Sequence, residues 1–123
     1  MIHIDTSALV DSLTGKKQSG RRLRKFIDES ERVYISAPVL FEWRRGPRSP
    51  EEIKYQEILF PSEQIVSFGA AEALLAADLY RMVRRARGRE TDIAIAACAI
   101  AYNARLWTLN PADFTDIPNL LLV

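Results

Sequence analysis

Short apolar runs alternate with amphipathic stretches along the whole chain. The runs that predict strands are rich in β-branched and aromatic residues, and they cover residues 1–4, 33–35, 65–67, 106–109 and 120–123. Between them, apolar residues recur at the i, i+3, i+4 spacing of a helix, most clearly over residues 70–87. Strands that alternate with helices favour a mostly parallel sheet with helices on both faces. The sequence therefore predicts one α/β domain over residues 1–123 with about five strands.

Local signals mark where the predicted helices begin and end. Ser36 is a favourable N-cap, and the breaker pair Gly46-Pro47 ends the helix that follows it. Thr91 and Asp92 are expected to cap a helix over residues 93–103, which is apolar on nearly every side and is therefore predicted to be buried. The other predicted helices cover residues 6–13, 19–28, 50–59 and 70–87, with a break at residues 14–17.

Composition and charge narrow the class of protein. Hydrophobic residues make up 48% of the chain and charged residues 27%, which is typical of a folded globular domain. The formal net charge of +1 argues against a uniformly basic nucleic-acid binder, but Lys and Arg gather in three patches, at residues 16–25, 44–48 and 81–89. These patches are suited to contacts with a polyanion.

Several classes of protein are disfavoured by what the sequence lacks. One cysteine, Cys98, provides neither a disulfide framework nor a zinc site, and it is expected to be a small buried residue. No apolar run approaches the length of a membrane span, and no basic segment precedes an apolar stretch at the N-terminus. We therefore expect no membrane association, no signal peptide and a cytoplasmic location.

The first predicted strand ends in an acid. Asp5 follows the apolar run directly, and the hydroxyl residues Thr6 and Ser7 come next. Aspartate is depleted in strands, and ligands of open α/β sheets bind at the carboxyl ends of the strands. Asp5 is therefore the first candidate for a site residue.

Three further acids stand at special places. Glu42 lies in a predicted helix between Phe41 and Trp43, Asp92 lies at the start of the apolar helix, and Asp113 lies in a turn after the fourth strand. Each also has an ordinary interpretation, because Glu is tolerated in helices, Asp caps helices and Asp forms turns.

Convergence of these acids would require a counter-charge. Two unit charges about 4 Å apart repel by roughly 4 kcal/mol at an effective dielectric of 20. Mg²⁺ or Mn²⁺, which favours oxygen ligands, would supply the counter-charge and would support phosphodiester hydrolysis. Thr6, Ser7 and Thr91 would then hold water or phosphate oxygens, and the basic patches would hold the polyanion backbone.

Four segments occur in a recognisable order along the chain. They are Ile4-Asp5-Thr6-Ser7-Ala8-Leu9, the helix with Ser36…Val39-Leu40-Phe41-Glu42, Thr91-Asp92-Ile93-Ala94-Ile95-Ala96-Ala97, and Trp107-Thr108-Leu109-Asn110-Pro111-Ala112-Asp113-Phe114 with Ile117-Pro118. Together they resemble a PIN domain, and most of all the VapC-type toxins of prokaryotic toxin–antitoxin pairs.

The resemblance implies a Mg²⁺- or Mn²⁺-dependent endoribonuclease that forms a homodimer and is silenced by a cognate antitoxin. It maps the first three family acids onto Asp5, Glu42 and Asp92. The fourth position falls on Asn110 or on the nearby Asp113. The nearly all-apolar helices and the apolar C-terminal strand also favour a homodimer.

Other interpretations carry less support. Haloacid-dehalogenase phosphatases need a second Asp two residues after the first, and position 7 is Ser. His3, the only histidine, is expected to be a packed strand residue, and Trp43 and Trp107 are expected in the core. The alternative to an enzyme is a non-catalytic module that binds RNA or a basic peptide in an acidic pocket without needing metal.

Overall fold

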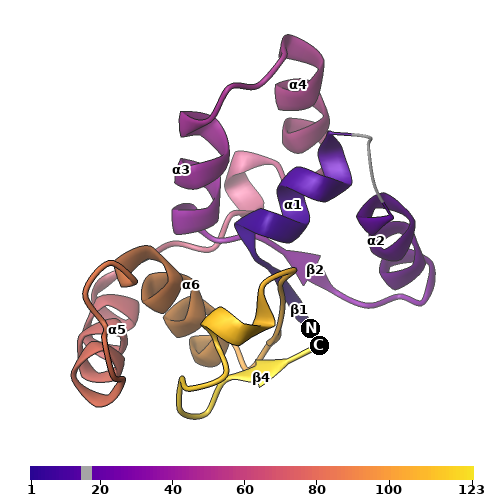
Figure 1. Cartoon of the computed structure of the whole chain (residues 1–123). Helices are drawn as coiled ribbons and strands as arrows, with labels where there is room; N and C mark the ends of the chain where they lie inside the picture. Colours follow the sequence, from indigo (N-terminus) through magenta and orange to yellow (C-terminus); the bar gives the residue numbers. More distant parts are fainter. Residues whose placement is uncertain (15–17) are drawn as a thin grey trace.

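A parallel sheet of four strands lies at the centre of the computed structural model, which describes residues 1–14 and 18–123 (Figure 1). The strands are β1 (Ile2–Ile4), β2 (Val33–Tyr34), β3 (Arg105–Trp107) and β4 (Leu121–Leu122), in the order β2-β1-β3-β4. The helices are α1 (Thr6–Leu13), α2 (Ser19–Asp28), α3 (Ala37–Arg45), α4 (Pro50–Leu59), α5 (Ala70–Met82) and α6 (Glu90–Ala101), with 3₁₀ turns η1 (Ser62–Gln64) and η2 (Pro111–Asp113). The predicted α/β domain with a parallel sheet is confirmed.

Helices cover both faces of the sheet. Side chains alternate between the two faces along each strand, so both faces carry apolar residues that the helices bury. His3 pairs in register with Leu106 and packs against Tyr34, whose hydroxyl donates to the backbone oxygen of Cys98 in α6. Ile4 pairs in register with Trp107, and the Trp107 ring meets Phe26 of α2 edge-on. Odd and even positions of β1 therefore face α6 and α2 respectively.

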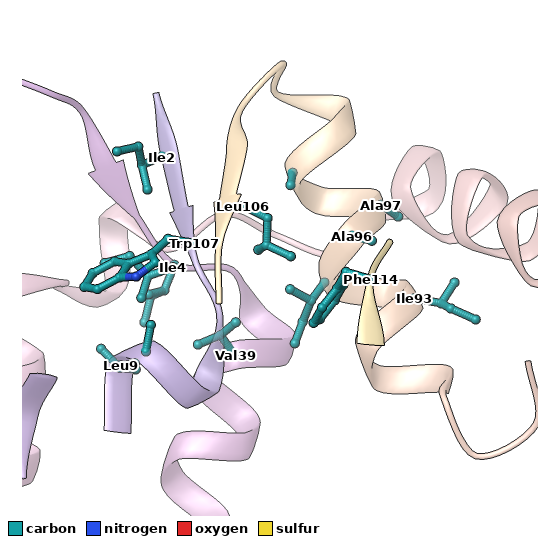
Figure 2. Close-up of a cluster of buried hydrophobic side chains, with 14 of the residues drawn as sticks. Ile2, Ile4, Leu9, Val39, Ile93, Ala96, Ala97, Leu106, Trp107 and Phe114 are labelled. Carbon is teal, nitrogen blue, oxygen red and sulfur yellow. The ribbon is translucent and has the colours of Figure 1, made fainter. Parts of the chain in front are cut away.

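The core extends from one face of the sheet to the other (Figure 2). Ile2, Ile4 and Leu9 are fully buried near β1, and Leu106 points toward the Ala96 and Ala97 face of α6. Half of the residues of α6 are buried, including the continuous run from Ile95 to Ala99, as its apolar sequence predicts. Its alanines leave little side-chain bulk, which permits close packing against the sheet. Trp43, Trp107, His3 and Cys98 are also buried, which confirms the expectation for each.

Several element boundaries differ from the predicted ones by a few residues, and three of the differences change the type, length or cap of an element. Residues 65–67 form one parallel bridge, Ser36 to Val66, instead of a fifth strand. The helix predicted over residues 70–87 ends at Met82, and Arg85 adopts a left-handed backbone conformation with φ of 53°, which no helix continues through. α6 begins at Glu90, so Arg89 and not Thr91 occupies the N-cap position. The predicted break at residues 14–17 falls mostly outside the described residues.

The strand order creates a crevice at one edge of the sheet. From β1 the chain crosses to β2 on one side, and it later returns to β3 on the other side of β1. Connections that leave in opposite directions open a crevice at the carboxyl ends of the two central strands, where α/β proteins bind ligands. Asp5 directly follows β1 and Thr108 directly follows β3, so both residues lie at this crevice. Within the described ranges, no helix is both long and apolar enough to cross a membrane.

His3 predicts how stability changes in acid. Its imidazole is fully buried, and Nε2 lies 2.8 Å from the Ser36 hydroxyl. Burial lowers the pKa of His3 from 6.5 to about 3. The unfolded chain binds this proton at a higher pH than the folded protein does. The stability that neutral His3 contributes to the folded protein is therefore complete above pH 6.5 and is lost as the pH falls toward 3.

The expected loss is about 1.4 kcal/mol per pH unit within that window, relative to His3→Gln, measured by urea unfolding of both proteins. The two proteins share every other titrating group, so the difference between their curves isolates His3. Parallel curves would contradict a buried neutral imidazole.

Candidate active site

Asp5 lies at the junction of β1 and α1, with only 5% of its surface exposed. Its backbone N–H donates to the Trp107 oxygen at 2.9 Å, which joins the ends of β1 and β3. Its carboxylate Oδ2 accepts hydrogen bonds from Ser7 Oγ at 2.9 Å and from Thr108 Oγ1 at 2.7 Å. The position and side-chain direction of Asp5 are therefore held by backbone and hydroxyl contacts from two segments.

Thr108 is a site residue that the sequence analysis did not single out. Its hydroxyl donates to Asp5 and accepts from the backbone N–H of Asn110 at 3.0 Å. The predicted strand over residues 106–109 placed Thr108 inside the strand, whereas β3 ends at Trp107 and Thr108 follows it directly. Residues that follow adjacent parallel strands meet at one edge of the sheet. Thr108 therefore supports Asp5 and also shapes the turn that carries Asn110.

Glu42 reaches the same region from α3. Its side chain is 17% exposed, so it differs from an ordinary solvated helix residue. Oε1 accepts a hydrogen bond from Thr6 Oγ1 at 2.6 Å, and Oε2 accepts from Arg45 Nη2 at 3.3 Å. The Thr6 contact ties Glu42 to the residue directly after Asp5, and the two carboxylates therefore lie in one neighbourhood.

Asp92 has a raised pKa. It is half-buried in the first turn of α6. Burial, followed by repulsion from Asp5, Glu42 and Asp113, raises the pKa of Asp92 from 3.8 to about 6, and only Arg89 opposes this rise. The shift links Asp92 electrostatically to all three of the other acids singled out in the sequence.

Hydrogen bonds from Arg89 hold the segment that contains Asp113 beside α6. The Arg89 guanidinium donates to Asp116 at 2.6 and 2.9 Å and to the Asp113 backbone oxygen at 2.9 Å. Asp113 is exposed and contributes to the repulsion on Asp92. Asn110 is exposed too, and the contact that defines its place is made by its backbone N–H. The sequence analysis did not single out Arg89, whose partner Asp116 lies 27 positions away.

The hydroxyls of Thr6 and Ser7 are engaged with carboxylates. Thr6 donates to Glu42, and Ser7 donates to Asp5 while accepting the Leu109 backbone N–H at 3.0 Å. In this arrangement both hydroxyls position acids. A role in holding water or phosphate remains a prediction for both residues.

The donor set fits a hard divalent cation. Asp5, Glu42 and Asp92 would supply carboxylate oxygens, and burial followed by repulsion from the other acids raises the pKa of Asp92. In residues 1–14 and 18–123, no group of three or more His, Cys, Asp or Glu side chains is placed so that it could hold a metal ion as the side chains stand. Mg²⁺ commonly keeps several waters and binds through one or two carboxylates, so an open donor set of this kind suits it.

One protein family matches nearly the whole chain. The sequence matches the PIN domain family over residues 2–120. No curated protein matches.

Similar solved structures include VapBC2 from Rickettsia felis bound to a DNA fragment from their promoter, with 23% identity and a TM-score of 0.74 over 100% of this chain and 98% of that one. DNA-bound VapBC from Salmonella typhimurium has 19% identity and a TM-score of 0.78 over 99% and 96% of the two chains. FitAcB from Neisseria gonorrhoeae has 20% identity and a TM-score of 0.73 over 100% and 97%. At these identities the similarity establishes the fold.

Replacing Asp92 by Asn is expected to stabilise the metal-free protein. A carboxyl whose folded pKa is raised destabilises the fold when charged, so the full effect is present above pH 6 and disappears as the pH falls below 3.8. Because the side chain is only half-buried, solvent screening reduces the gain to about 1 kcal/mol. Urea unfolding in EDTA at about pH 7.5 and at about pH 4 measures the gain and its loss.

With saturating Mg²⁺, the wild type is expected to become more stable than Asp92→Asn. At about 100 times its dissociation constant the ion adds roughly 2.7 kcal/mol to the wild type, and we expect it to add less than about 1.7 kcal/mol to Asp92→Asn. Glu63→Gln, an exposed acid on η1, is the control for loss of one negative charge. An Asp92→Asn protein less stable than the wild type in EDTA would contradict the raised pKa.

Proposed function

The chain belongs to the PIN domain family, and from this premise we propose that it is a Mg²⁺- or Mn²⁺-dependent endoribonuclease, the toxin of a toxin–antitoxin pair. The observation that carries the proposal is the nearly buried carboxylate of Asp5, held by Ser7 and Thr108 where β1 and β3 end, with Glu42 bound to the neighbouring Thr6. The pKa of Asp92, raised by burial and then by repulsion from the other acids, supports it. Carboxylates gathered at this edge call for a cation, and a hydrolase acting on phosphodiester bonds uses such a cation.

Asp5, Glu42 and Asp92 are the residues that would hold the metal. A bound divalent ion supplies an activated water and neutralises charge on the phosphate. The chain itself orients the ligands through Thr108 and Ser7 on Asp5 and through Thr6 on Glu42.

A fourth polar ligand or water-positioning group would come from the segment after β3. Asp113 is supported by its repulsion on Asp92, and Asn110 is supported by the family resemblance and by its position two residues after Thr108. The contacts of Arg89 with Asp113 and Asp116 hold this segment at the edge of the acidic site.

An antitoxin partner is supported by the similar structures, several of which are toxin–antitoxin complexes. A basic side chain from such a partner, placed among the carboxylates, would balance their charge and compete with the metal. Inhibition would then be measured as a loss of metal-dependent cleavage when the partner is added.

A homodimer is supported by an exposed apolar face on α3 and α5. The apolar α6 is used inside the fold, so the exposed surface differs from the one that the sequence suggested. Phe41 is 59% exposed, and Leu74 and Met82 are 70% and 65% exposed. Phe41 also lines a largely apolar groove of about 740 Å³, with Phe68, Ala77 and Tyr80 in its wall. Contiguous exposed apolar surface marks interaction sites.

Asp5→Asn is expected to abolish cleavage and to leave the fold intact. The substitution keeps the shape of the side chain and removes the charge that would hold the metal. The measurement is cleavage of a mixed RNA pool by wild type and variant, each with EDTA, Mg²⁺ and Mn²⁺. We expect cleavage by the wild type only, and only with metal.

Glu63→Gln is the matched control, because it removes an exposed acid on η1 that is not among the residues proposed to hold the metal. Cleavage by Asp5→Asn at the wild-type rate would overturn the assignment. Binding of RNA that is neither cleaved nor changed by metal would favour the alternative function, a non-catalytic RNA- or peptide-binding module.

Ala77→Arg is expected to convert a dimer into a monomer. Ala77 is exposed and lines the apolar groove, so an arginine there would place a charge and a long side chain in the interface. Light scattering would give twice the 14.0 kDa chain mass for the wild type and the single mass for the variant. Ala71→Arg, on the same helix outside the groove, is the control. A wild-type monomer at micromolar concentration would contradict the dimer.

A further inference from the structure

A second groove, with a volume of about 630 Å³, runs between α2 and the end of β3. This α2 groove is lined by the basic residues Arg21, Arg22 and Lys25 and by Phe26, Trp107 and Leu109, together with Gln18, Ser19 and Glu29. Its size falls in the range of ligand-binding clefts. The acidic site lies outside it, so a separate ligand or a separate part of one ligand would fill it.

The aromatic wall of the α2 groove carries a guanidinium. The Arg22 Cζ lies 5.4 Å from the centre of the Phe26 ring and 5.7 Å from the centre of the Trp107 ring, and the two rings meet edge-on at 5.2 Å. Contact with aromatic faces holds the guanidinium by cation–π attraction. Arg22 is exposed, so the guanidinium presents a flat surface to the groove. Nucleic-acid bases stack on such guanidinium planes.

The charge of the α2 groove is available for a ligand. In the described part of the chain, neither Arg21 nor Arg22 makes an ion pair, and the Lys25 ammonium meets Glu29 only at 3.9 Å on an exposed surface. Ion pairs of that kind are weak. Arg21 and Lys25 stand four residues apart on one helix, which places them on the same face. They form a row of positive charge along one side of the groove.

One segment joins the α2 groove to the acidic site. Leu109 lines the groove, and its backbone N–H donates to the Ser7 hydroxyl, which in turn donates to Asp5. Trp107 lines the groove as well and accepts the Asp5 backbone N–H through its oxygen. A polymer that enters the acidic site therefore finds a basic cleft with an aromatic wall next to it.

We propose that the α2 groove binds single-stranded RNA on one side of the cleavage point, with a base stacked on Arg22 and phosphates against Arg21 and Lys25. The inference rests on the proposed nuclease function. A flat stacking surface beside a row of cations is the combination that single-stranded nucleic acid uses. An acidic peptide would need only the cations, so the stacked Arg22 favours RNA.

Binding is tested in the Asp5→Asn background, so that the RNA survives the measurement. The probe is fluorescein-labelled oligoadenylate of about 12 nucleotides, followed by anisotropy over a range of salt concentrations. Arg22→Lys keeps the charge and removes the plane, and it is expected to weaken binding about tenfold with little change in salt dependence. Arg21→Gln and Lys25→Gln are each expected to lower the slope of log affinity against log salt by about 0.7.

Arg24→Gln is the matched control, because Arg24 is exposed on the same helix and lies outside the α2 groove. It is expected to change affinity by less than about twofold. Thermal melting verifies the fold of each variant, and Arg22→Gln is the second substitution at the stacking position. In the active protein, the groove variants should cleave more slowly at low RNA concentration and still bind Mg²⁺ normally by calorimetry.

Three outcomes would overturn the proposal. They are equal losses from Arg24→Gln and Arg22→Lys, absence of RNA binding by the folded protein, and displacement of the RNA by a polyglutamate peptide with the same dependence on the variants. Cleavage by the wild type together with unaffected groove variants would overturn the α2 groove alone. Groove-dependent binding without metal-dependent cleavage would overturn the nuclease alone.

Discussion

The nearly buried carboxylate of Asp5, with other acids close to it, is the constraint that the rest of this structure has to sustain. Asp5, Glu42, Asp92 and Asp113 come from four distant segments, and burial with mutual repulsion raises the pKa of Asp92 to about 6. The parallel sheet sustains this arrangement because β1 and β3 are embedded in a packed core, which fixes the residues that follow them. Hydroxyls from Ser7 and Thr108 then supply the hydrogen bonds that stabilise the nearly buried carboxylate of Asp5.

Charge is divided between two neighbouring surfaces. The acidic site is suited to binding a cation. The α2 groove carries Arg21, Arg22 and Lys25 and is suited to binding a polyanion. Both surfaces share the end of β3 and the two residues after it, where Trp107 and Leu109 face α2 while Thr108 faces Asp5. Alternation of side chains along an extended segment thus gives each surface part of its lining. A net charge of +1 for the whole chain conceals this division.

The apolar residues of α6 are largely buried, whereas several of those on α3 and α5 are exposed. α6 is nearly all apolar and is buried against the sheet, with Ile95 and Ala96 fully inaccessible. The helices α3 and α5 are less uniformly apolar, and they leave Phe41 and Leu74 exposed. The sequence suggested a dimer partly because α6 is apolar, but the structure uses that helix in its own core. The surface available for a second copy lies on α3 and α5.

The sequence by itself determined the fold class, the buried α6 and the place of Asp5, because hydrophobic periodicity and residue propensity act over a few neighbouring residues. It also singled out Glu42, Asp92 and Asp113, although nothing local shows that they meet. Tertiary structure alone decided that the predicted strand at residues 65–67 is a single bridge, that Thr108 holds Asp5 across 103 positions and that Arg89 clasps Asp116. These outcomes depend on which strands become neighbours, and hydrogen bonds between distant segments form only after the core has set that order.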